Sequence, residues 1–231
     1  MFVGGDTLAS MQIERVAAED FDWAAEDGPA AEVRRIARAS TAHDGSITLN
    51  EQVLLQLKNR GLRDASLWVA TGSSDGHHDG FAMRHGDIVD LAVHPDARGH
   101  GAGTALAAEV VADGRKVEAW SHGDHPAAAR IAERFGVARE RELKIMRRSL
   151  AGPIPEVVLP AGVTIRGFRP DDEAALLEVN ASAFAHHPEQ GHMTHEDFRE
   201  RSTESWFDPD GLLLAVPSRG SDGPRQRHRC R

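Results

Sequence analysis

The stretch that most constrains the fold is an apolar strand followed by a glycine-rich loop and a helix. It runs from Asp90 to Thr104 as DLAVHPDARGHGAGT, and the helical sequence continues as ALAAEVVADG. Three closely spaced glycines allow backbone N–H groups to approach an anion, and the dipole of a helix N-terminus favours the same negative charge. The segment has neither a Walker lysine nor the spacing GxGxxG. We therefore expect an anion-binding loop of another kind, and a glycine-rich turn without a ligand is the alternative.

The remaining pattern alternates between strands and helices, which is typical of an α/β (α+β) chain. Short apolar runs predict strands over residues 11–16, 67–70, 80–84, 87–93, 116–120 and 142–147. Apolar residues at helical spacing predict helices over residues 29–41, 103–113 and 125–135. A further helix follows Asn50, whose side chain is suited to capping its first turn.

A proline-rich segment at residues 151–162, AGPIPEVVLPAG, divides the chain, because its three prolines and two glycines prevent regular structure. The pattern then restarts with strands over 163–168 and 212–216. One helix is predicted to begin at 170–172, and a second is predicted over 195–202. The order strand–helix–helix–strand repeats that of the start of the chain. We expect four parts: a complete domain at 11–150, the linker 151–162, a partial second copy at 163–216, and a tail at 217–231.

The composition of the chain restricts which partners it can bind and which cellular compartment suits it. The tail PSRGSDGPRQRHRCR predicts a disordered, non-native end, with a basic arm for nucleic acid as the alternative. The net charge of −9 argues against non-specific nucleic-acid binding. One cysteine, Cys230, cannot form an intrachain disulfide, and no apolar run is long enough to span a bilayer. We expect a cytoplasmic monomer that binds neither nucleic acid nor membrane.

The spacing R-G-x-G-x-G from Arg98 onward resembles motif A of the GCN5-related N-acetyltransferases. The resemblance implies a mixed, mostly antiparallel sheet flanked by helices, and acetyl-CoA as cosubstrate. It implies that the preceding strand faces the thioester and pantetheine through Leu91, Ala92 and Val93. It also implies that main-chain amides cradle the pyrophosphate at Gly99, His100, Gly101, Ala102, Gly103 and Thr104.

The first domain departs from this family at one catalytic position. Many members carry a tyrosine in the pattern N-x-x-A-x-x-x-Y-x-x-x-G-F, where it protonates the departing thiolate. Alignment on Gly136 and Val137 places Ala132 at the tyrosine, and the chain contains no tyrosine at all. A general acid contributes roughly 10²–10⁴-fold to a rate. We therefore expect the first domain to bind acetyl-CoA but to transfer acetyl groups poorly.

A second, narrower resemblance comes from NEQVL at 50–54, FAHHPEQG at 184–191 and WFDPDG at 206–211. These blocks resemble the mycothiol synthases, tandem acetyltransferases that acetylate the cysteinyl amine of cysteinyl-glucosaminyl-inositol. The resemblance implies substrate contacts from Glu51 and Glu189. In that family the second domain carries the catalytic residues, so those of this chain stay unknown. We expect a truncation or frameshift after Val216 that impairs activity.

Three alternatives stay open. Six potential metal ligands cluster near the second block, but they suit no single helix face and form no HExxH pattern, so we expect no metal. They are His186, His187, Glu189, His192, His195 and Glu196. The functional alternative is a catalytically silent acetyl-CoA-binding module with a structural or regulatory role, and an acetyltransferase with a different substrate is a third hypothesis.

Overall fold

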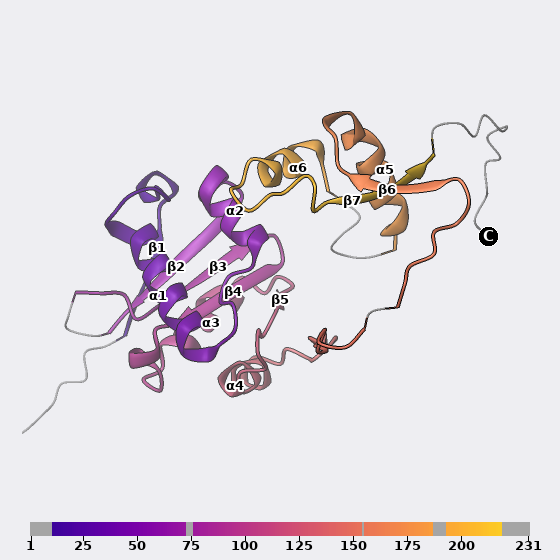
Figure 1. Ribbon diagram of the computed structural model, residues 1–231. Helices are drawn as coiled ribbons and strands as arrows, with labels where there is room; N and C mark the ends of the chain where they lie inside the picture. Colours follow the sequence, from indigo (N-terminus) through magenta and orange to yellow (C-terminus); the bar gives the residue numbers. More distant parts are fainter. Residues whose placement is uncertain (1–10, 73–75, 154, 187–192, 219–231) are drawn as a thin grey trace, which may run out of the picture. The chain divides into compact units, whose positions relative to one another are not determined.

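The structure is a computed structural model that describes residues 11–72, 76–153, 155–186 and 193–218. The chain divides into two compact units, Met1–Glu142 and Leu143–Arg231, called unit 1 and unit 2 below (Figure 1). None of the helices in the described ranges combines the length and the apolar character that crossing a bilayer requires.

Unit 1 is built on a five-stranded sheet in the order β1-β2-β3-β4-β5. The first four strands are antiparallel neighbours, and β5 pairs with β4 in parallel. The strands are β1 (Gln12–Val16), β2 (Ala65–Thr71), β3 (Gly80–His85), β4 (Ile88–Val93) and β5 (Glu118–Ala119). This arrangement confirms the predicted mixed, mostly antiparallel sheet.

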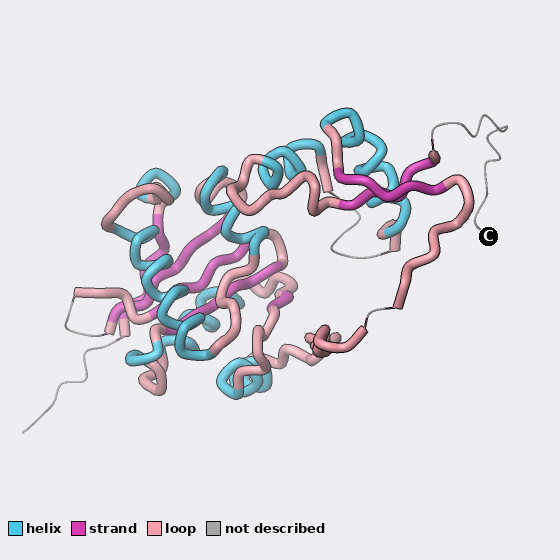
Figure 2. Tube along the Cα trace, in the orientation of Figure 1, coloured by secondary structure: helices cyan, strands magenta, loops and turns pink. Residues whose placement is uncertain are grey.

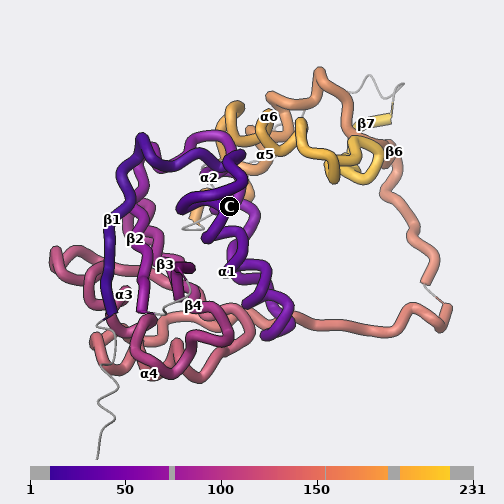
Figure 3. The backbone as a smooth tube through the Cα atoms, turned by 90° about the vertical axis from the view of Figure 1, so that its left-hand side faces the viewer, coloured from indigo at the N-terminus to yellow at the C-terminus, as the bar shows by residue number. Residues whose placement is uncertain are grey.

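Helices cover both faces of this sheet, and a hydrophobic core lies on each side. The helices are α1 (Gly28–Asp44), α2 (Glu51–Arg60), α3 (Ala102–Val111) and α4 (Pro126–Arg134). Val33 and Ile36 of α1 pack with Phe81 in one core, whereas Leu106 and Val110 of α3 pack in the other. Figure 3 shows α1 and α3 on opposite sides of the strands. Asn50 caps α2 as predicted, because its Oδ1 accepts a hydrogen bond from the backbone N–H of Val53 at 3.0 Å.

The prediction of a strand over residues 142–147 is wrong. Figure 2 draws the chain between α4 and β6 as loop, and the side chains of Leu143, Ile145 and Met146 are exposed. A strand needs a hydrogen-bonded neighbour as well as apolar residues. None of the strands that the structure describes pairs with this segment. The predicted strand at 116–120 forms only over the two residues of β5.

The described part of unit 2 contains a two-stranded antiparallel sheet, a 3₁₀ helix and two α-helices. Its elements are β6 (Val163–Gly167), the 3₁₀ helix η3 (Pro170–Asp172), α5 (Glu173–Ala183), α6 (His195–Ser202) and β7 (Leu213–Pro217). Phe168, Phe198 and Phe207 pack edge to face, with ring centroids 5.3 to 6.3 Å apart. Pro217, the first residue of the predicted tail, ends β7 opposite Val163. The rest of that tail from 219 lies outside the described residues.

Candidate functional site

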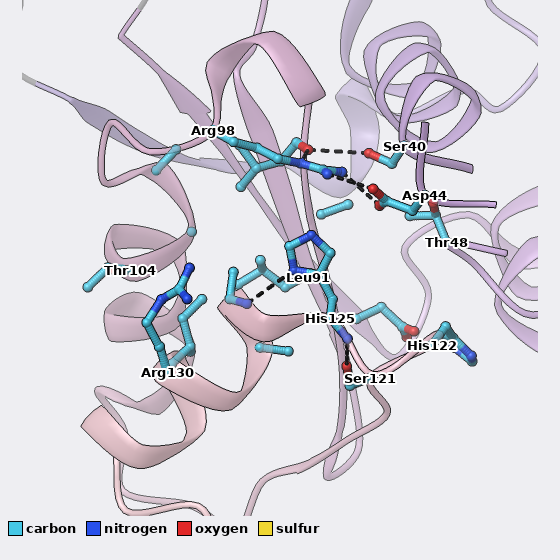
Figure 4. A pocket seen from close by; sticks show the side chains of 18 of the residues that line it. Ser40, Asp44, Thr48, Leu91, Arg98, Thr104, Ser121, His122, His125 and Arg130 are labelled. Carbon is cyan, nitrogen blue, oxygen red and sulfur yellow. Dashed lines mark hydrogen bonds and ion pairs between the residues drawn. The ribbon is translucent and has the colours of Figure 1, made fainter. Parts of the chain in front are cut away.

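A cavity of about 770 Å³ opens in unit 1 beside the carboxyl end of β4. Its walls come from β4, the glycine-rich loop and the first turn of α3, with further residues from the end of α1, the segment after β5, and α4. Figure 4 shows these elements converging on one space. The cavity therefore joins the predicted anion loop to segments that lie far from it in the sequence.

The cavity exists because β4 and β5 separate. Their pairing consists of Ile88 with Glu118 and Val89 with Ala119 and goes no further. Beyond Val89 the outer edge of β4 has no neighbouring strand among the described residues. An unpaired strand edge presents backbone N–H and C=O groups that can bind an extended ligand in the manner of an added strand.

The glycine-rich loop ends in an open helix N-terminus. Gly99 and Gly101 adopt φ values of +83° and +95°, which residues with a Cβ rarely adopt. Gly101 is the N-cap of α3, and no side chain caps this first turn. The first N–H groups of a helix have no partner within it, so they favour an anion. Arg130 and Arg134 of α4 line the same cavity and add positive charge.

Arg98 holds the loop against α1. Its Nη1 and Nη2 donate to the two carboxylate oxygens of Asp44 at 2.7 and 2.8 Å, and its Nε donates to the carbonyl of Val93 at 3.1 Å. Ser40 donates to the same carbonyl at 3.3 Å. Hydrogen bonds from Arg98 lower the pKa of Asp44 to about 2. All three guanidinium nitrogens of Arg98 already donate to groups of the protein. The role of Arg98 is therefore to hold the loop in place.

The cavity brings together eight of the nine residues predicted to contact acetyl-CoA. They are Leu91, Ala92, Val93, Gly99, Gly101, Ala102, Gly103 and Thr104. His100 is exposed and is not among the lining residues. Ala132, which is predicted to stand at the position of the family's tyrosine, lies on α4 and also does not line the cavity.

The two predicted substrate carboxylates are placed differently. Glu51 begins α2 and is exposed, and it is not among the residues that line the cavity. Glu189 lies outside the described residues, as do His187 and His192 of the potential metal cluster. His195 faces Glu173, with 2.6 Å between Nδ1 and Oε1. Within the described residues, no group of three or more His, Cys, Asp or Glu side chains could hold a metal ion.

Sequence reasoning missed three residues of the site. Asp44 was missed because its role depends on a contact with Arg98, 54 positions further along the chain. Asp90 and His122 line the cavity, and each has a buried side-chain atom that finds no hydrogen-bond partner among the described residues. The one available signal was the charge of Asp90 within the otherwise apolar strand IVDLAV.

Two comparisons define the class of protein. The model of the acetyltransferase (GNAT) family matches residues 59–137, a range that contains β2 to β5, the loop and the cavity's main walls. A crystal structure of a GCN5-related N-acetyltransferase from Sphaerobacter thermophilus superposes with a TM-score of 0.53 at 23% identity. The match covers 90% of this chain and 67% of that one. The shared fold and the family model together place the part of the chain that holds the cavity in the GCN5-related acetyltransferase class.

Curated relatives narrow the class further. A mycothiol acetyltransferase from Nocardioides sp. is 48% identical over 201 residues, which cover 85% of this chain and 65% of the relative. A mycothiol acetyltransferase from Nocardia farcinica is 43% identical over 203 residues, which cover 85% and 67%. The chain belongs to the mycothiol acetyltransferase family, as the sequence blocks predicted. It spans about two thirds of the length of these relatives.

Proposed function

We propose that the cavity of unit 1 binds acetyl-CoA. Backbone groups of β4 at Leu91, Ala92 and Val93 would hold the pantetheine arm, and the loop from Gly99 to Thr104 would hold the pyrophosphate. The observation that carries this proposal is the junction of an unpaired strand edge with an uncapped helix N-terminus in one cavity. The strand edge suits an extended arm that carries amide groups, and the helix N-terminus suits a phosphate anion.

The proposed acceptor is the cysteinyl amine of cysteinyl-glucosaminyl-inositol, a small molecule used in mycothiol biosynthesis. The name of the relatives, mycothiol acetyltransferase, supports acetyl transfer in mycothiol biosynthesis. Glu51 and Glu189 would contact it, because a carboxylate accepts several hydrogen bonds from an ammonium and from hydroxyl groups. We also propose a cytoplasmic protein without nucleic-acid partners, which the single cysteine and the net charge of −9 favour, and we propose that it is a monomer without membrane partners.

Unit 2 is proposed to be the start of a second acetyltransferase copy. Its order β6-η3-α5-α6-β7 repeats the order of β1, the 3₁₀ helix η1 (Ala18–Asp20), α1, α2 and β2 in unit 1. In both units the first and last of these strands pair antiparallel. The proposed domains are 11–150 and 163–216, with the linker at 151–162.

A catalytically silent acetyl-CoA-binding module is the second candidate function. It is favoured by Ala132, which stands where the family's tyrosine protonates the thiolate, and by the absence of tyrosine from the sequence. Under this proposal the cavity keeps its binding function and lacks the general acid, so turnover would fall by roughly 10²–10⁴-fold.

Calorimetric titration of the full chain with acetyl-CoA tests the binding step. We expect Gly101→Ala to weaken binding at least tenfold, because a Cβ at φ +95° strains the loop that presents the N–H groups. Gly86→Ala is the matched control, since Gly86 also has a positive φ, +60°, and also has open space around it, but lies in the turn between β3 and β4. Unchanged affinity in Gly101→Ala would contradict the proposed site.

An acetyl-transfer assay on the same protein distinguishes the two functions. Release of CoA thiol with the cysteinyl-glucosaminyl-inositol acceptor supports the enzyme, whereas binding without thiol release supports the silent module. Failure of acetyl-CoA to bind at all would overturn both.

A further inference from the structure

Asp90 places a carboxylate in the middle of β4, at the wall of the cavity. Side chains alternate between the faces of a strand. Asp90 therefore shares its face with Ala92, which packs in the core beneath α1 and α2, while Leu91 and Val93 pack on the α3 side. The Oδ2 atom of Asp90 is buried without a hydrogen-bond partner, and this burial raises the pKa of the carboxyl to about 6.

His122 also lines the cavity, and it carries a second buried polar atom without a hydrogen-bond partner among the described residues. Its Nε2 is buried and makes no hydrogen bond, and burial lowers the pKa of the ring, which favours the neutral imidazole. Its backbone carbonyl accepts a hydrogen bond from Ser46 Oγ at 3.3 Å. Figure 4 shows His122 on the segment next to Ser121. This contact fixes the residue against the loop between α1 and α2.

Two unpartnered buried groups in one cavity indicate a ligand, since the large majority of buried polar atoms in proteins are hydrogen-bonded. A buried carboxylate is stabilised most by a positively charged donor. A neutral imidazole nitrogen is a donor or an acceptor according to its tautomer, and a hydroxyl group can satisfy either. Asp44, another carboxylate that lines the cavity, is occupied by Arg98.

We propose that Asp90 and His122 form a binding site in unit 1 for a small amino alcohol, an ammonium group with neighbouring hydroxyls as in an amino sugar. Asp90 takes the ammonium, and His122 takes a hydroxyl.

The position of this site along β4 relates it to the proposed function. Asp90 precedes Val93 by three residues, which is roughly 10 Å of strand, and so lies further from the loop. An acetyl-CoA molecule whose pyrophosphate sits at the loop would extend its arm along β4 toward Asp90. The site rests on the proposed function in this respect, and it adds an acceptor position within unit 1.

Nuclear magnetic resonance titration of the isotope-labelled full chain with D-glucosamine, and separately with D-glucose, tests the site. The two sugars differ at one position, an ammonium against a hydroxyl. We expect glucosamine to shift the backbone amides of Asp90 and Leu91 and the imidazole signals of His122 in a saturable way. We expect glucose to bind at least tenfold more weakly.

Three variants sharpen the test. Asp90→Asn should weaken glucosamine binding at least tenfold and bring it close to that of glucose, and His122→Ala should weaken it several-fold. Asp96→Asn removes a carboxylate that is 93% exposed and does not line the cavity, so it should bind as the wild type does. The spectra themselves report whether each variant is folded. If Asp90→Asn does not fold, His122→Ala still tests the site.

The inference is overturned if glucosamine and glucose give the same shifts, if Asp90→Asn binds like the wild type, or if no shifts occur and the two groups bind only water. The affinity for acetyl-CoA is measured on the same samples. Glucosamine binding without acetyl-CoA binding would reject the proposed function and leave the amine site in place, whereas the reverse result would reject the amine site alone.

Discussion

Individual side chains of the site divide into those that the sequence reveals and those that only folding assembles. The loop glycines could be predicted, because their spacing is a short local pattern. The structure places Gly99 and Gly101 at positive φ, as such a loop requires. The pairing of Arg98 with Asp44 could not, because it joins residues 54 positions apart. The same holds for Asp90 and His122, whose polar atoms lose water only when distant segments close around them. Long-range burial has no signature in a local motif.

The first prediction concerns the stability of Asp90→Asn as a function of pH. The pKa of Asp90 is raised from 3.8 to about 6, so the folded chain binds this proton more tightly than the unfolded chain does. Stability is therefore lost as pH rises from about 4 to about 6, by up to about 3 kcal/mol. The amide side chain of the variant has no charge to bury, so urea unfolding at pH 7.5 should show the variant to be more stable by at least about 1 kcal/mol.

The pH profile supplies the control for this prediction. The advantage of Asp90→Asn should shrink at pH 4, where the wild-type carboxyl is protonated in the folded state. Asp96→Asn changes an exposed carboxylate in the segment that follows the same strand and should show no such trend. A constant difference between Asp90→Asn and the wild type from pH 4 to pH 7.5 would contradict a buried, titrating Asp90.

At the scale of elements, Arg84 ties the end of α3 to two neighbouring segments of the chain. This residue is 5% exposed, and it donates to the carbonyls of Gly86, Val110 and Lys116 and to the carboxylate of Asp113. These bonds join the turn after β3, the end of α3 and the segment before β5. Together with the buried Leu106 and Val110 of α3, they hold the helix whose open N-terminus lies at the cavity.

The second prediction is that Arg84→Met lowers the free energy of unfolding by about 2–4 kcal/mol. Methionine fills a similar volume but leaves several buried carbonyls without a donor. Arg115→Gln is the control, because Arg115 is 59% exposed and its removal should change stability by no more than about 0.5 kcal/mol. Denaturant unfolding measures both, and equal stabilities of the two variants would show that Arg84 does not hold the elements together.

Element positions show what local pattern can and cannot predict. The helix that Asn50 caps and the strand before the loop form where predicted, because a cap and an apolar run are local signals. The strand predicted at 142–147 does not form, although Leu143 and Ile145 are apolar. A strand depends on a neighbouring edge, and the sequence near the strand does not contain that information. The same dependence explains why β5 is only two residues long.

At the scale of the whole molecule, the two units differ in how much they can bury. Unit 1 contains a five-stranded sheet with a core on each face. In unit 2 a two-stranded sheet accompanies two helices, and among its described residues only Leu177 and Phe198 belong to the buried hydrophobics. Small units with little buried apolar surface have little stability of their own. We therefore expect the two units to unfold in separate transitions, with unit 2 first.

The third prediction follows from this difference. A ligand stabilises only the part of the protein that binds it, by about 2.7 kcal/mol at a hundred times its Kd. In differential scanning calorimetry of the full chain, acetyl-CoA should raise the Tm of the later transition by roughly 5–10 °C and leave the earlier one in place. Acetyl-pantetheine, which lacks the pyrophosphate for the loop, should give a much smaller shift, and so should acetyl-CoA with Gly101→Ala. A shift confined to the earlier transition would instead place the acetyl-CoA site in unit 2, because unit 1 would then melt independently of the ligand.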